Sequence, residues 1–227
     1  MTGRTAHYYR QLTRLSSAFA FVADMVLLTL GGSFKFKEKI SGRLADVLTH
    51  LYLASAVLKY HRDAGSPQED HPLVHWAIRD SLFQIQNALV NALRNFPSPV
   101  VGWLIQWVIF PLGRPYREPS DRLGRYAARI LYTENPARER LCSGIFLAHD
   151  DSITARLDRA FTGVLATSTI EKRLKNQLGL DLNMDNCEQV AEKGLASGVI
   201  NEEEAQTLRE TYALVRSVIN VDDFTPG

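Results

Sequence analysis

Apolar residues recur along this chain with the spacing of one face of an α-helix, and this periodicity restricts what it can fold into. The first long stripe lies near the N-terminus and consists of Tyr8, Leu12, Leu15, Phe19, Val22 and Val26. Residues three or four apart share a helix face. The opposite side carries Phe21, Met25 and Leu28. We therefore expect a helix that is covered on both sides.

Two further segments repeat the helical pattern. The second stripe consists of Ile40, Leu44, Val47, Leu48, Leu51 and Leu58. The third segment follows a polar loop, has Pro72 in its first turn and runs to about Asn95. Proline suits this position because the first N–H groups of a helix have no partner within it. Its stripe consists of Val74, Ile78, Leu82, Ile85, Leu89 and Leu93.

Helix-start signals predict shorter helices in the second half of the chain. Ser120 is expected to be an N-cap, with Asp121 at the positive helix end. Two pairs resemble capping boxes: Asp185 with Glu188, and Asn201 with Glu204. The last helix has the stripe Ala205, Leu208, Tyr212, Val215 and Ile219. With no convincing strand alternation, the sequence predicts an all-α fold, an antiparallel helical bundle with a smaller C-terminal helical appendage.

Composition and charge exclude some classes of function. The net charge of +1 over 227 residues gives no overall field that would attract nucleic acid. Cys142 and Cys187 match no metal or redox spacing, so we expect reduced core thiols and a cytoplasmic protein. The N-terminus lacks the apolar core of a signal peptide. No uninterrupted run reaches the roughly 18 apolar residues of a spanning helix, so we expect none.

The longest apolar run, Val100 to Leu112, leaves three interpretations open. As a helix it would place Trp103, Trp107 and Phe110 on one face. A helix that is apolar all round is usually buried in a core, which is the favoured interpretation. An interface with another domain or subunit is the second, because exposed aromatic patches mark interfaces. Peripheral membrane insertion is the third, although the run lacks a lysine-rich polar face.

Weaker chemical signals are best explained structurally. Arg114 and Arg117 follow the apolar run and could meet a phosphate. The cluster Lys35, Lys37, Lys39 and Arg43 is expected to be a solvated helix end. His71 and His75 have the spacing of a metal face, but lack the glutamate of a metalloprotease motif. In the segment 149–154, "HDDSIT", we expect Asp150 or Asp151 to cap a helix. No residue is assigned a catalytic, metal-binding or cofactor-binding role.

Long segments resemble one family in the same order along the chain. They are "LTRLSSAFAFVADMVLLTLGGSFKFKEKISGRLADVLTHLYLASAVLKYH", "PLVHWAIRDSLFQIQNAL", "VIFPLGRPYREPSDRLG", "ASGVINEEEAQTL" and "SVINVDDF". These segments resemble the bacterial-type C-terminal domain of long-chain acyl-CoA dehydrogenases of fatty-acid β-oxidation. The resemblance covers the chain from about Tyr8 to Phe224.

The resemblance implies a role in a flavoenzyme. Members of this family use FAD to introduce an α,β double bond into fatty acyl-CoA, and an electron-transfer flavoprotein reoxidises the flavin. The family's catalytic glutamate precedes the matching region, so Glu38, Glu171 and Glu202 to Glu204 are not candidates for it. We expect FAD to be held elsewhere in the parent enzyme, and the chain to be inactive alone.

The resemblance also implies a division of labour within the chain. Residues 8–62 would complete the helical domain of the catalytic part, and residues 67–224 would form an appended module. The module would support a homodimer or a peripheral position on the inner membrane. The alternative is a free-standing helical module that binds a protein or a membrane and has no dehydrogenase activity.

Overall fold

A computed structural model describes residues 5–146 and 152–220, in which helices dominate and no β-strand occurs. The prediction of an all-α fold is therefore confirmed. Clustering of contacts divides the chain into two units, Met1–Arg138 and Glu139–Gly227. Each unit has a hydrophobic core of its own. The expected boundary between 8–62 and 67–224 concerns a parent enzyme, and it stays a prediction.

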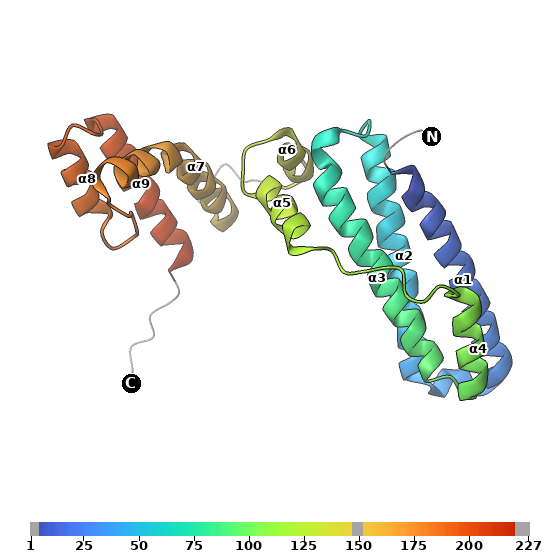
Figure 1. Cartoon of the computed structure of the whole chain (residues 1–227). Coiled ribbons are helices and arrows are strands. Elements are labelled where there is room, and N and C mark those ends of the chain that lie inside the picture. Colours follow the sequence, from blue (N-terminus) through green and yellow to red (C-terminus); the bar gives the residue numbers. More distant parts are fainter. Residues whose placement is uncertain (1–4, 147–151, 221–227) are drawn as a thin grey trace, which may run out of the picture. The chain divides into compact units, whose positions relative to one another are not determined.

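In the N-terminal unit, long helices run antiparallel to their neighbours in the chain (Figure 1). They are α1 (Ala6–Leu30), α2 (Glu38–Asp63) and α3 (His71–Arg94). Short 3₁₀ helices join them, η1 (Gly31–Phe36) and η2 (Gln68–Asp70). The unit also contains α4 (Pro99–Ile109) and α5 (Asp121–Leu131), and α6 (Pro136–Cys142) spans the boundary. Because α3 contacts α1, α2, α4 and α5, it is the central element.

The apolar stripes form the core of this unit largely as expected. All six predicted residues of α3 are buried, and five of the six on α1 are buried. Phe19 packs against the core while remaining partly exposed. On α2, Leu48 is exposed, so its assignment to the stripe is wrong. Leu48 directly follows the buried Val47 and is therefore rotated about 100° away from it around the helix.

Gly102 allows α4 to approach the end of α3 closely. A Cβ atom built at this position would lie 2.3 Å from the carbonyl oxygen of Leu93 and 2.9 Å from the Cβ of Phe96. Both neighbours belong to the end of α3 and the turn that follows it, so neither can move freely. Glycine is therefore the residue that fits here without displacing one helix from the other.

A buried glutamine fastens the connector between α4 and α5 to α3. The Gln86 Nε2 atom donates a hydrogen bond to the carbonyl oxygen of Tyr116 at 2.8 Å. Its Oε1 atom accepts one from the Tyr116 N–H at 3.0 Å. An unsatisfied buried amide would cost about 1–3 kcal/mol. The pairing therefore satisfies Gln86 and fixes the path of residues 110–120.

The C-terminal unit packs the helices α7 (Ile153–Leu178), α8 (Cys187–Ala196) and α9 (Glu202–Ile219) around its own core. The helices α7 and α9 approach closely at Gly163, where an added Cβ would lie 2.8 Å from the hydroxyl of Thr211. In the predicted stripe of α9, Ala205 and Leu208 are buried. Ile219, at the helix end, is exposed and does not belong to the buried face.

Three of the predicted helix starts can be compared with the structure. Ser120 accepts a hydrogen bond from the N–H of Leu123 and is the N-cap of α5, as predicted. Asn201 and Glu204 form the expected capping box at the start of α9. The box predicted for Asp185 and Glu188 is wrong, since α8 begins after Asn186 and has no side-chain cap.

The failed capping box has a structural reason. Asn183 Oδ1 accepts hydrogen bonds from the N–H groups of Asp185 and Asn186, forming a tight polar turn before α8. Glu188 instead accepts a hydrogen bond from Arg209 at 2.9 Å. Both acidic residues are thus engaged in other contacts, because Asp185 pairs with Arg216.

A cap before α7 also differs from expectation. The side chain of Ser152 accepts a hydrogen bond from the N–H of Ala155 and is the N-cap. His149, Asp150 and Asp151 lie outside the described residues. The N-cap of α7 is therefore Ser152 and not Asp150 or Asp151.

The predicted core thiols are confirmed for one cysteine. Cys187 is buried, and its sulfur lies 3.8 Å from the carbonyl oxygen of Leu208. Burial raises the pKa of the Cys187 thiol, and the negative charge of Glu188 adds to the effect. Cys142, at the end of α6, is only half-buried, so the prediction of a core position is wrong for it. Both cysteines are free thiols.

We predict opposite effects for alanine at two glycines of the N-terminal unit. Gly102→Ala should destabilise it by about 1–3 kcal/mol, because the added methyl group overlaps the end of α3. Gly42→Ala, on α2, is the matched control, since its Cβ would meet nothing within 4 Å. It should stabilise the helix by about 0.5–1 kcal/mol. Urea unfolding followed by circular dichroism measures both. Equal free energies of unfolding for the two variants would contradict the close approach.

We also predict that the two thiols react at different rates. At about pH 8, Cys142 should react with a disulfide reagent in the native protein. Cys187 should react only after unfolding, because it is buried and its raised pKa leaves less thiolate at any given pH. In the Cys142→Ser variant Cys187 is the remaining thiol, so the reaction rate of this variant reports on Cys187. Reaction of that variant as fast as the wild type would contradict the assignment.

Candidate functional site

The helix α4 presents an unpartnered apolar face. Its buried side consists of Gly102, Ile105 and Ile109. Its other side is exposed, with Trp103 65% and Trp107 62% accessible. The exposed apolar residues recur at helical spacing and are Val100, Trp103, Leu104, Trp107 and Val108. We call these five residues the α4 face; none of them carries a charge.

The core interpretation of this segment holds for only part of it. Ile105, Ile109 and Phe110 are buried, so the side facing α3 is core, as favoured. The tryptophans are exposed, and for them that interpretation is wrong. The expectation that Phe110 shares their face is also wrong. The helix ends at Ile109, and Phe110 leaves helical geometry with φ −129° and ψ 63° and is only 5% exposed.

An apolar groove lies beside the α4 face. Its volume is about 620 Å³, and its lining includes Ala18 and Phe21 of α1 together with Val108 and Leu112. Arg14 closes one end by donating a hydrogen bond to the carbonyl oxygen of Ile109 at 2.9 Å. This bond satisfies a terminal carbonyl of α4 and ties α4 to α1. The α4 face and α1 thus form one apolar region of the N-terminal unit.

The outer sides of α1 and α2 extend this exposed apolar surface. On α1, Phe21, Leu27 and Leu28 are exposed, and Leu28 is 80% accessible. On α2, Tyr52 and Leu53 are exposed together with Leu48. The expected cover on the second side of α1 is therefore absent at Phe21 and Leu28 among the described residues, and only Met25 packs against the core. Within the part of the chain that the structure describes, nothing covers these side chains.

Within the described residues, one segment is long and apolar enough to cross a bilayer. It is Ala6–Phe36, whose most apolar window has a mean hydropathy of 1.7. Only 17% of that window is buried. The expectation of no spanning helix concerned uninterrupted apolar runs, and Ser16, Ser17 and Asp24 interrupt this segment, so that expectation stays a prediction. One such helix is weak evidence for a span, since core helices and signal sequences pass the same test.

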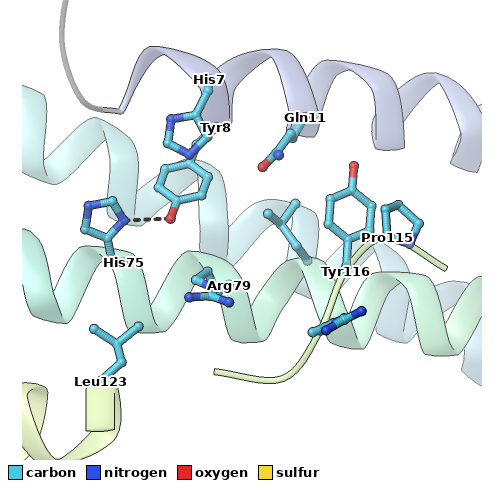
Figure 2. A pocket seen from close by; sticks show the side chains of 10 residues that line it. His7, Tyr8, Gln11, His75, Arg79, Pro115, Tyr116 and Leu123 are labelled. Carbon is cyan, nitrogen blue, oxygen red and sulfur yellow. Dashed lines mark hydrogen bonds between the residues drawn. The ribbon is translucent and has the colours of Figure 1, made fainter. Parts of the chain in front are cut away.

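A polar pocket of about 540 Å³ lies between α1, α3 and the connector (Figure 2). We call it the α1–α3 pocket. His7, Tyr8 and Gln11 line it from α1, and His75 and Arg79 line it from α3. The connector and the start of α5 complete the lining with Pro115, Tyr116, Arg117 and Leu123, and Leu82 of α3 lies at its wall.

A short hydrogen bond joins the two helices at this pocket. The Tyr8 hydroxyl lies 2.6 Å from Nδ1 of His75, as Figure 2 shows. Burial raises the pKa of Tyr8, and the positive charge of Arg79 opposes this shift in part. The phenol therefore stays protonated at neutral pH. The bond fixes both rings across the gap between α1 and α3.

The structure separates the two arginines that follow the apolar run. Arg117 lines the α1–α3 pocket, where the Gln86–Tyr116 pairing holds its neighbour in place. Arg114 is exposed on the connector. Arg117 is also exposed, so the two arginines differ only in that Arg117 lines this pocket and Arg114 does not. Sequence reasoning missed Tyr8, His75 and Arg79 as partners, because two distant helices contribute them.

The other sequence signals find little support. The rings of His71 and His75 lie 5.9 Å apart between centroids, and among the described residues no three His, Cys, Asp or Glu side chains could hold a metal ion. Lys35, Lys37 and Lys39 are exposed around η1 and the start of α2, as expected of a solvated helix end. Lys35 stacks over the ring of Phe36 at 4.9 Å.

We predict that the α4 face contributes little to stability. Changing Trp103 and Trp107 together to Ala should alter the free energy of unfolding by only about 0.5 kcal/mol for each, because both side chains are mainly in solvent. Ile105→Ala, on the buried side of the same helix, should cost about 2–5 kcal/mol. Urea unfolding compares them. A loss as large for the tryptophan variant as for Ile105→Ala would contradict the exposed placement.

Comparison with known proteins identifies the family. No solved structure matches the chain. A family model described as acyl-CoA dehydrogenase, C-terminal, bacterial type, matches residues 1–224. The matched range includes every helix of both units. The chain therefore belongs to the family of bacterial-type C-terminal domains of acyl-CoA dehydrogenases.

Proposed function

We propose that this chain is the C-terminal, non-catalytic part of an FAD-dependent acyl-CoA dehydrogenase. The parent enzyme would introduce the α,β double bond into fatty acyl-CoA during β-oxidation. The family match over residues 1–224 supports the proposal. The observation that carries the structural role is the set of large apolar side chains left exposed on α1, on α2 and on the α4 face. Apolar patches of this kind mark contacts with other proteins or membranes.

The occupant we propose for this surface is the catalytic part of the enzyme. A helix that is apolar on both sides requires packing partners on both sides. On α1, the inner side packs on α2 and α3, and the outer side carries Phe21 and Leu28. Covering it with catalytic helices would complete a two-sided bundle. Support of a homodimer belongs to the same proposal, because an interface can extend over the α4 face.

Two acidic residues of the C-terminal unit, Glu171 and Glu204, have structural partners, which supports a non-catalytic role for them. Glu171 accepts hydrogen bonds from Thr167 at 3.0 Å and from the Tyr212 hydroxyl at 3.2 Å. Glu204 belongs to the capping box of α9 and pairs with Arg173. These hydrogen bonds lower the pKa of Glu204. Neither carboxylate is available as a proton-abstracting base.

The family implies FAD in the parent enzyme. We assign no flavin-binding residue here. In the parent enzyme, other domains would hold FAD and acyl-CoA, and an electron-transfer flavoprotein would reoxidise the flavin.

The second candidate is a free-standing module on a membrane. The exposed tryptophans and the apolar composition of Ala6–Phe36 favour it. Indole rings suit the boundary between lipid headgroups and acyl chains. In this case the protein would be cytoplasmic and peripheral on the inner membrane.

Association with separately purified catalytic domains tests the first proposal. The partner is an acyl-CoA dehydrogenase catalytic part from the organism that encodes this chain. We expect the two to elute together from a sizing column. Leu28→Arg should abolish co-elution, because it places a charge in the apolar contact. Ile153→Arg, exposed in the C-terminal unit, is the control and should co-elute like the wild type.

Measurements on the same purified chain distinguish the two proposed functions. The chain alone should show no flavin absorbance and no acyl-CoA turnover. Two results together would favour the membrane module. The chain would fail to co-elute with the catalytic part, and it would sediment with anionic vesicles unless Trp103 and Trp107 were changed to Ala. Turnover by the chain alone would refute the non-catalytic assignment.

A further inference from the structure

We propose that the α1–α3 pocket binds a small organic phosphate of mononucleotide size. This inference does not rest on docking to catalytic domains. The pocket carries the positive charges of Arg79 and Arg117, two histidines also line it, and none of the described residues that line it is Asp or Glu. Within the described chain, neither arginine forms an ion pair. A ligand with negative charge would offset their mutual repulsion.

The side chains favour phosphate over a simple halide or other small anion. A guanidinium presents several N–H donors in a plane, which matches the oxygens of phosphate in pairs. Arg79 comes from α3 and Arg117 from the connector, so two separate elements supply these donors. The Gln86–Tyr116 pairing fixes the connector beside Arg117 before any ligand binds. The backbone beside Arg117 is therefore held in place, although the side chains of Arg79 and Arg117 are themselves exposed.

The size and the remaining lining indicate the rest of the ligand. A volume of about 540 Å³ lies in the range of small-molecule pockets and exceeds the needs of a lone phosphate. Tyr116, Leu82 and Leu123 supply flat or apolar walls. The Gln11 Oε1 atom is buried and accepts no hydrogen bond from the residues that the structure describes. A buried acceptor of this kind suits a hydroxyl or amino group on the ligand.

Figure 2 shows how the polar groups surround the pocket. The Gln11 amide projects from α1, and the Tyr116 ring projects from the connector. Arg79 projects from α3 and lies below Tyr8 in this view. Because Tyr8 is bonded to His75, its ring is held as part of the wall. The phosphate is assigned to the arginines, and the organic group to the wall formed by the Tyr116 ring.

Calorimetric titration with adenosine 5′-monophosphate tests the proposal. We expect saturable binding at or below about 1 mM, and binding of adenosine and of inorganic phosphate at least about tenfold weaker. Raising the salt concentration should weaken binding of the nucleotide, because the contact is between charges. No saturable binding of the nucleotide, or equal affinity for nucleotide and adenosine, would overturn the proposal. Equal affinity for nucleotide and inorganic phosphate would also overturn it.

Matched variants locate the site. Arg79→Gln and Arg117→Gln should each weaken nucleotide binding by about tenfold or more, since each removes a hydrogen bond to a charged group. Arg129→Gln, exposed on α5 outside the pocket, makes the same change in charge and should bind like the wild type. Circular dichroism confirms that each variant is folded. Unchanged affinity in both pocket variants, or an equal loss in Arg129→Gln, would place binding elsewhere and overturn the proposal.

Discussion

The buried amide of Gln86 determines the arrangement of the N-terminal unit beyond its own helix. A glutamine side chain in an apolar core is tolerated only when both its donor and its acceptor are satisfied. Here the backbone of Tyr116 satisfies both. The connector is consequently fixed to α3. Its ends carry Phe110 into the core and Arg117 into the α1–α3 pocket. The position of the connector beside the proposed binding site thus depends on one pair of hydrogen bonds.

The unit uses α3 as a shared support for two different surfaces. The helices α1 and α2 and the α4 face leave large apolar side chains in solvent. Between α1 and α3, the α1–α3 pocket is lined by arginine, histidine and tyrosine side chains. An apolar surface gains free energy when a partner covers it, whereas a cationic pocket gains it from an anion. The two surfaces therefore need not have the same occupant.

Periodicity in the sequence was sufficient to predict the helices and most of the core. The periodicity correctly predicts the buried face of α3 because other helices pack around α3, so every residue of its apolar stripe contacts a neighbour. It fails at Trp103 and Trp107, because composition cannot tell which side of an apolar helix finds a partner. It also fails at Phe110, where the helix ends one residue earlier than the extrapolated pattern requires. The α1–α3 pocket lay beyond prediction, since Tyr8 and His75 are brought together only by tertiary packing.

The two units have separate hydrophobic cores, one built from α1 to α4 with Phe110 and the other from α7 to α9 with the turns between them. Side-chain volumes in one core place no demand on those in the other. Mutations that fill or empty space around Leu174 and Leu208 leave the packing around Leu89 unaltered. Substitutions can therefore accumulate in the core of the C-terminal unit independently. The helices that carry the apolar surface and the α1–α3 pocket can keep their own core residues.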